Sequence, residues 1–277
     1  MITEFLHHKL NVEGCAEGTA HEYEKNLRAF ATWVNATAPG TGWSGLTVEL
    51  MNAHVAAMTE AKLKPRAIKL RVSAVRSLLN WLCATGRLKT NPLRYQQTPK
   101  PGHQLPKVAD LDAVTKFVTA PTASPITLEI QALVALLAET GMRISEATGM
   151  RTTDVDKEHR AIRVRGKGNK ERVVYYGDMS RAKLNALAGV KNCKFVIFAR
   201  SQEEYRALMS REMKPYTDYI HPHMLRHAYA THMLEAGASL SAIAANLGHE
   251  STRMAERYAH VATTEAARAA TALAPRL

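Results

Sequence analysis

The sequence is poor in features that mark secreted, disulfide-bonded or zinc-bound proteins. Only three cysteines occur among its 277 residues, at Cys15, Cys83 and Cys193. Because they are odd in number and widely separated, they provide neither a disulfide framework nor the spacing of a zinc site. The expected compartment is therefore a reducing cytoplasm.

Long apolar segments are also missing. The run Ala132–Ala138 is far too short to span a bilayer, and the segment from Met1 to Lys9 lacks the apolar core of a signal peptide. We find no internal repeat, and the only segment of low complexity is an alanine-rich carboxyl end. Because a hydrophobic content of 46% is ordinary for a globular protein, we expect a soluble intracellular protein without membrane contact.

Acidic residues are absent from one long stretch. From Ala61 to Lys107 there are eleven Lys or Arg residues and no Asp or Glu. This stretch supplies most of the formal net charge of +12, and a pI near 9.7 favours a polyanionic partner, either nucleic acid or an acidic membrane surface. A solvated charged face is the usual alternative, but without balancing acids we expect contact with double-stranded DNA.

The first part of this stretch is predicted to be a helix. Apolar residues recur at steps of four and three, Pro65 suits the first turn and Gly86 suits the stop. The apolar positions are Ile68, Val72, Val75, Leu79 and Leu82. Basic residues form a row on a neighbouring face, so the helix can lie against a phosphate backbone or in a groove. The predicted DNA-binding residues are Lys62, Arg66, Lys69 and Arg76 in that row, followed by Arg87, Lys89 and Arg94.

Prolines after this helix predict a domain boundary. They stand at positions 92, 99, 101 and 106, where they block helix continuation and cannot donate to a sheet ladder. Residues 87–109 are therefore expected to form a basic, extended linker. Before it, residues 1–86 are expected to form a bundle of three or four helices, one through Tyr23 to Val34 and another capped by Thr47. Residues 110–277 form the predicted second domain.

The second domain is predicted to be mainly α with a small β-sheet, which makes the whole chain an α+β protein. Helices are expected from Asp110 to about Val118, over 126–139, from Arg143 to about 149, and from Pro222 onward with breaks near Gly237 and Gly248. Strands are expected over 161–165 and 171–176, joined by a glycine-containing turn, with a third short strand over 195–198.

A dispersed set of polar residues indicates phosphate chemistry. The set is Arg143, His223, Arg226, His249 and, nine residues later, Tyr258. Arginines can clamp a phosphate, histidines can donate or shuttle protons, and a tyrosine oxygen can attack phosphorus. Taken singly, each has a plainer interpretation: Arg143 as a surface partner of Glu146, His249 as a capping residue, Tyr258 as a half-buried aromatic. Lys167, at a hairpin tip, is solvated in the plainer interpretation but could reach a leaving oxygen as a general acid.

The histidines near position 223 also raise the question of zinc. A zinc hydrolase motif needs a glutamate directly after its first histidine, but Met224 follows His223 and Arg226 would place a cation inside the site. We therefore expect no metal, and nothing in the set requires a cofactor.

Taken together, the segments that carry these residues closely resemble the tyrosine recombinase (phage integrase) family, with its Xer-like branch the nearest. The segments are Thr140–Ala147, Gly166–Arg172, His221–Leu234, Leu247–His249 and Tyr258–Val261. The resemblance covers the second domain, and the helical basic first domain is similar to the family's core-binding, SAM-like domain. It implies that the two domains form a clamp round DNA.

The resemblance also implies a role for each residue. The six implied catalytic residues are Arg143, Lys167, His223, Arg226, His249 and Tyr258. The two arginines would bind the scissile phosphate, and Tyr258 would attack it, forming a 3′-phosphotyrosyl link and freeing a 5′-hydroxyl. Lys167, with Lys170 as its rival, would protonate that leaving oxygen. His223 would assist proton transfer at the tyrosine, His249 would support the phosphate, and Glu146 would orient Arg143.

The activity implied is site-specific recombination by a homo-tetramer on two duplex sites with paired inverted half-sites, without metal or ATP. A partner recombinase or accessory factor, and the choice between chromosome-dimer resolution and element integration, stay open. The alternatives are a type IB topoisomerase and a DNA-binding regulator with an inactive site. An alanine-rich helix expected over Thr263–Ala274 could pack on a neighbouring subunit or on its own domain.

Overall fold

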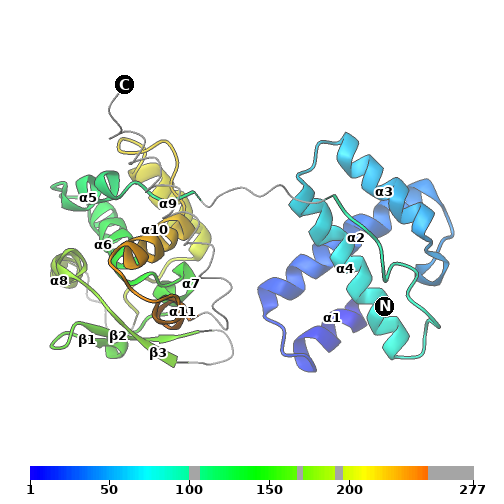
Figure 1. Cartoon of the computed structure of the whole chain (residues 1–277), viewed down its shortest axis with the longest axis horizontal. Helices are drawn as coiled ribbons and strands as arrows, with labels where there is room; N and C mark the ends of the chain where they lie inside the picture. Colours follow the sequence, from blue (N-terminus) through cyan, green and yellow to red (C-terminus); the bar gives the residue numbers. More distant parts are fainter. Residues whose placement is uncertain (100–106, 167–170, 191–195, 249–277) are drawn as a thin grey trace, which may run out of the picture. The chain divides into compact units, whose positions relative to one another are not determined.

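The structure, a computed structural model of the whole chain, describes residues 1–99, 107–166, 171–190 and 196–248. The chain divides into an amino-terminal unit, Met1–His103, and a carboxyl-terminal unit, Gln104–Leu277. Both are visible in Figure 1. Within the described ranges, every helix is too short or too polar to span a membrane.

The amino-terminal unit is a four-helix bundle, which confirms the predicted helical domain. Its helices are α1 (Ile2–Asn11), α2 (Glu17–Thr37), α3 (Val48–Glu60) and α4 (Pro65–Ala84), with a 3-10 turn at Trp43–Gly45. Fully buried Phe5, Leu27 and Leu79 belong to one core shared by α1, α2 and α4. The predicted cap of α3 is present, since the Thr47 side chain accepts from the Leu50 N–H at 3.2 Å.

Helix α4 has the predicted apolar stripe, since all five of its stripe residues are at most 3% exposed. Arg66 and Lys69 are exposed on this helix, whereas Arg76 is half-buried and donates to the Gln96 carbonyl at 3.0 Å. The placement of Lys62 on the same helix was wrong. Pro65 fixes the first turn of α4, so Lys62 lies in the preceding turn, with a left-handed φ of 56°.

Part of the predicted linker packs against the amino-terminal unit. Leu93 is fully buried in that unit's core, and Asn91 donates to the Asn80 side chain at 2.7 Å. Gln96 donates to the Asn52 side chain at 2.8 Å. Burial of Leu93 holds this basic, proline-containing segment against the unit. The described part of the predicted linker is therefore not wholly extended, as it was expected to be. Positions 100–106 lie outside the described residues.

The carboxyl-terminal unit is built round helix α6. Its helices are α5 (Leu111–Thr119), α6 (Pro125–Thr140), α7 (Ile144–Thr148), α8 (Asp178–Val190), α9 (Gln202–Glu212), α10 (Pro222–Glu235) and α11 (Leu240–Leu247). A 3-10 turn covers Thr152–Asp154. Residues 130–137 of α6 are all buried, because α5, α8, α9 and α10 pack around this helix (Figure 1). Because α6 is surrounded on all sides by other helices, its residues can be apolar all round, which explains the continuous apolar run Ala132–Ala138.

A small antiparallel sheet completes this unit, as predicted. Its strands, β1 (Val155–Asp156), β2 (Ala161–Arg165) and β3 (Glu171–Tyr175), lie in the order β1-β2-β3. The third strand expected over 195–198 was wrong, because the described part of that segment forms only an isolated bridge between Arg151 and Val196. Phe198 is fully buried, so the apolar character of the segment reflects core packing rather than strand pairing.

Candidate active site

A left-handed glycine sets the start of the site. Helix α6 ends at Thr140 and is capped by Gly141, whose φ is 63°. A Cβ atom at this position would lie 2.4 Å from the Tyr229 ring and 2.8 Å from Leu247. Only glycine therefore combines this backbone turn with such close packing. The turn directs the chain from the buried helix into Arg143.

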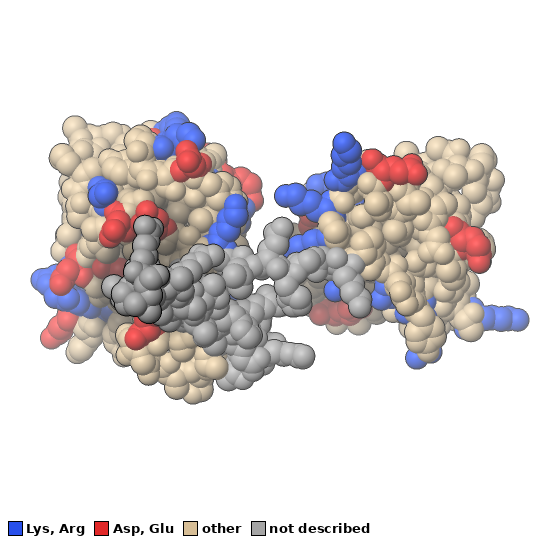
Figure 2. Space-filling view, turned by 45° about the horizontal axis from the view of Figure 1, so that its top comes forward, with Lys and Arg blue, Asp and Glu red and all other residues tan. Residues whose placement is uncertain are grey.

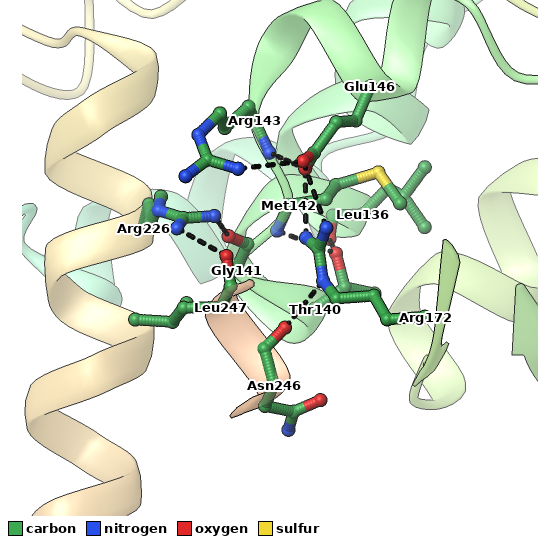
Figure 3. A network of polar contacts seen from close by, with 10 residues as sticks. All are labelled: Leu136, Thr140, Gly141, Met142, Arg143, Glu146, Arg172, Arg226, Asn246 and Leu247. Carbon is green, nitrogen blue, oxygen red and sulfur yellow. Dashed lines mark hydrogen bonds and ion pairs between the residues drawn. The ribbon is translucent and has the colours of Figure 1, made fainter. Parts of the chain in front are cut away.

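Arg226 is held by two backbone carbonyl groups. Its Nη1 donates to the Gly141 oxygen and its Nη2 donates to the Leu247 oxygen, both at 2.6 Å. The residue is only 4% exposed, and Leu225 and Ala228 of the same helix α10 are buried in the core. The ends of α6 and α11 thus fix the direction of a guanidinium group on α10 (Figure 3).

Arg143 is fixed by the carboxylate of Glu146, as expected from the sequence. The Glu146 Oε2 accepts from the Arg143 backbone N–H at 2.6 Å, and Oε1 accepts from its Nη1 at 2.9 Å. One carboxylate therefore caps helix α7 and orients the arginine at its start. About a third of the Arg143 side chain (34%) is exposed, while that of Glu146 is 4% exposed.

Sequence reasoning missed a third arginine at this site. Arg172 of β3 donates from Nη1 and Nη2 to the two oxygens of Glu146, both at 2.9 Å, and from Nε to the Asn246 carbonyl at 2.8 Å. A signal was available in the strand alternation. Arg172 has the same parity as Val174, which is fully buried, so its side chain had to leave β3 on the covered face.

The charges of this cluster decide which groups are ionised. Burial by itself would raise the pKa of Glu146, but hydrogen bonds from Arg172 and from the Arg143 backbone, with the charges of both arginines, hold it below its ordinary value of 4.5. Glu146 is therefore ionised at neutral pH. It balances two arginines within the cluster.

His223 lies in the field of the same arginines. Its ring stacks on His221, with centroids 5.5 Å apart. Partial desolvation lowers the pKa of His223 below 6.5, and the charges of His221, Arg226, Arg206 and Arg143 lower it further. The imidazole is therefore neutral at neutral pH and able to accept a proton.

The structure brings four of the predicted site residues into one cluster: Arg143, Glu146, Arg226 and His223. The other three, Lys167, His249 and Tyr258, lie outside the described residues. Two of these positions are close in sequence to the cluster, since β3, which carries Arg172, begins four residues after position 167, and Leu247 lies two residues before position 249.

Basic residues predicted to bind DNA lie on the other unit. Lys62, Arg66, Lys69, Lys89 and Arg94 are exposed there. Arg87 is also exposed, but it is paired with Glu4 at 2.5 Å and lies over the Trp81 ring. In the view of Figure 2, several Lys and Arg side chains lie close together at one edge of the amino-terminal unit, beside acidic ones, and others are spread over the rest of its visible surface. The exposed basic residues suit a polyanionic partner.

Comparison with known proteins agrees with the fold and shows the family. Residues 107–265 match the Phage integrase family, and residues 2–86 match its N-terminal SAM-like domain. Tyrosine recombinase XerC of Haemophilus influenzae is 32% identical over 231 residues, covering 79% of this chain and 78% of that protein. The XerC protein of Xanthomonas campestris is 30% identical over 270 residues, covering 94% and 84%.

Solved structures of DNA-bound recombinases share the fold. The Tn1549 transposon integrase in complex with a circular intermediate DNA has a TM-score of 0.72 at 16% identity, covering 93% of this chain and 94% of that one. A lambda integrase dimer bound to a COC′ core site has a TM-score of 0.71 at 17% identity, covering 92% and 94%. The family match and the relatives place the chain among the tyrosine recombinases. The chain belongs to the phage integrase family, and its activity is site-specific tyrosine recombination.

Proposed function

We propose that this recombinase cleaves double-stranded DNA at a phosphate held by Arg143 and Arg226, with Tyr258 as the nucleophile. The observation that carries the proposal is the fixation of two guanidinium groups from separate segments, one on α10 by two carbonyls and one before α7 by a buried carboxylate. Groups fixed in advance stabilise the charge of a pentavalent phosphorane without reorganising during the reaction.

The proposed step balances in protons and bonds. The Tyr258 oxygen attacks phosphorus while its proton passes to His223, whose lowered pKa keeps it neutral and able to accept. The bond to the 5′ oxygen breaks, Lys167 protonates that oxygen, and a 3′-phosphotyrosyl link remains; Lys170 is the rival for this role. His249 supports the phosphate. Attack by a 5′-hydroxyl of the partner duplex reverses the step, so no metal or ATP is consumed.

The proposed substrate is a pair of duplex sites with inverted half-sites, and the proposed assembly is a homo-tetramer. Support comes from relatives of the same fold, since one XerH structure contains a palindromic difH substrate and the lambda integrase structure is a dimer on DNA. Exposed residues of the amino-terminal unit, including Arg66 and Lys69, would contact phosphates. We further propose that the two units, joined by a linker over 87–109, clamp the duplex. We also propose that the protein acts in the cytoplasm, in association with the nucleoid.

A two-site plasmid assay tests this function. The plasmid carries two copies of the DNA segment that the purified protein retains from sheared genomic DNA of its source. We expect exchange between the copies in buffer with EDTA and without ATP, and none with Tyr258→Phe. Relaxation of supercoils without exchange would favour a topoisomerase, and binding without cleavage an inactive regulator. Either result contradicts the proposal.

A further inference from the structure

Arg172 is fully engaged with protein acceptors in this cluster, although the proposed reaction gives it no role. Each of its three side-chain nitrogens donates to a protein acceptor, and the side chain is 13% exposed. A group so enclosed is poorly placed to bind a phosphate itself. Its contacts instead connect it to Arg143 and Arg226, the two arginines proposed to bind the phosphate.

Two of these contacts make Arg172 the second partner of the carboxylate that holds Arg143. The pairing with Glu146 is bidentate, so it fixes the carboxylate plane as well as its position. That plane determines where Oε1 meets the Arg143 guanidinium and where Oε2 meets its backbone N–H. Without Arg172, an almost fully buried carboxylate would lose two of its four hydrogen bonds and turn toward other donors or water.

The third contact reaches a different segment. The Asn246 carbonyl, which accepts from Arg172 Nε, is one residue before Leu247, whose carbonyl holds Arg226. The Arg172 guanidinium also lies close beneath Gly248, where an added Cβ would meet its Nη1 at 3.0 Å. One side chain therefore contacts both the Arg143–Glu146 pair and the segment that fixes Arg226 (Figure 3).

We propose that Arg172 is a positioning residue for DNA cleavage, which sets the spacing between the Arg143 and Arg226 guanidinium groups by binding Glu146 and the end of α11 together. This inference rests on the proposed function, because the spacing matters only if both arginines hold one phosphate. Arg172 acts through its neighbours and touches no reacting atom. A lysine at this position would keep the charge, but its single nitrogen could not replace the three nitrogens of the planar guanidinium group, which reach three acceptors in different directions.

The test compares cleavage with binding. Single-turnover cleavage of a nicked duplex and the Kd for that duplex are measured for the full chain, for Arg172→Lys and for Arg211→Lys. Arg211 is an exposed arginine paired with Glu212 at 2.8 Å, so it provides the matched control. We expect Arg172→Lys to cleave about 10- to 100-fold more slowly, the cost of a small misplacement of catalytic groups, with an unchanged Kd. Arg211→Lys should match the wild type.

A second pair of measurements separates positioning from simple loss of folding. Millimolar guanidinium chloride should restore part of the cleavage rate of Arg172→Ala, because the ion can occupy the vacated space beside Glu146. Combining Arg172→Lys with Glu146→Gln should slow cleavage little more than either change alone, since both act on one contact.

The outcomes distinguish this inference from the proposed function. If the wild type does not cleave, the proposed function fails. If the wild type cleaves and Arg172→Lys cleaves at the same rate, the positioning role is overturned. It is also overturned if the rate of Arg172→Lys falls only in proportion to its folded fraction, measured by circular dichroism. Slow cleavage by a folded, DNA-bound Arg172→Lys supports it.

Discussion

At the scale of single residues, the site depends on arginines whose directions are set by protein acceptors. Arg226 uses two backbone carbonyls, so its direction follows from where α6 and α11 end. Arg143 uses a carboxylate that a second arginine shares. Partial desolvation, together with these charges, lowers the pKa of His223. Single substitutions in this cluster should therefore change the direction of an arginine side chain or the pKa of His223.

The pH dependence of cleavage should report the state of His223. Its pKa is lowered from 6.5, so the neutral form that accepts a proton persists below the pH at which a free histidine ionises. The single-turnover rate should be level near neutral pH and fall only as the pH drops below about 6.5, through the lowered pKa. The rate is measured from about pH 5 to about pH 8. An acidic midpoint above 6.5 would contradict this account.

Replacing Gly141 should damage both folding and cleavage. In Gly141→Ala the new methyl group would meet Tyr229 at 2.4 Å on a left-handed backbone, and the carbonyl that holds Arg226 would move. We expect a loss of about 3 kcal/mol or more in the free energy of unfolding. Urea denaturation measures it. Gly189→Ala is the control, because its position is helical and open and the change should be neutral or slightly stabilising.

At the scale of elements, caps and apolar periodicity were enough to predict α2 to α7, α10 and α11. Helices α8 and α9 were missed, because their periodicity is weak: α8 buries only Ser180 and Leu187, and α9 only Tyr205 and Met209. Strand β1 has two residues, too few for any pattern. Arg172 was missed because its partner Glu146 lies 26 residues away, and the fold alone brings them together.

Helix α8 is expected to depend on a cap from another helix. Glu139 of α6 accepts from the N–H groups of Gly177 and Ser180 at 3.0 Å and of Met179 at 3.3 Å. Glu139→Ala should lower the free energy of unfolding by about 2 kcal/mol, since the carboxylate binds several helix-start donors. Thermal unfolding checks this. Glu203→Ala, in an exposed pair with Arg206, should change it by less than about 0.5 kcal/mol. If both substitutions lowered the free energy of unfolding equally, Glu139 would not be a stabilising cap of α8.

At the scale of the whole molecule, the excess of positive charge should set the affinity for DNA. The net charge is +12, and Arg66 and Lys69 are exposed on α4. If each contacts one phosphate, Arg66→Gln with Lys69→Gln should reduce the slope of log Kd against log salt by about 2. Arg28→Gln, an exposed residue paired with Glu24 at 2.8 Å, should leave the slope unchanged. An unaltered slope in the double variant would show that Arg66 and Lys69 do not contact DNA phosphates.

The central claim concerns the residue that becomes joined to DNA. A nicked duplex should trap a covalent complex in the presence of EDTA, and its peptides are then mapped by mass spectrometry. The account predicts a 3′-phosphate linked to the peptide containing Tyr258, a free 5′-hydroxyl on the other strand end, and no complex with Tyr258→Phe. A link to another residue, a link to a 5′-phosphate, or trapping that survives Tyr258→Phe would contradict it.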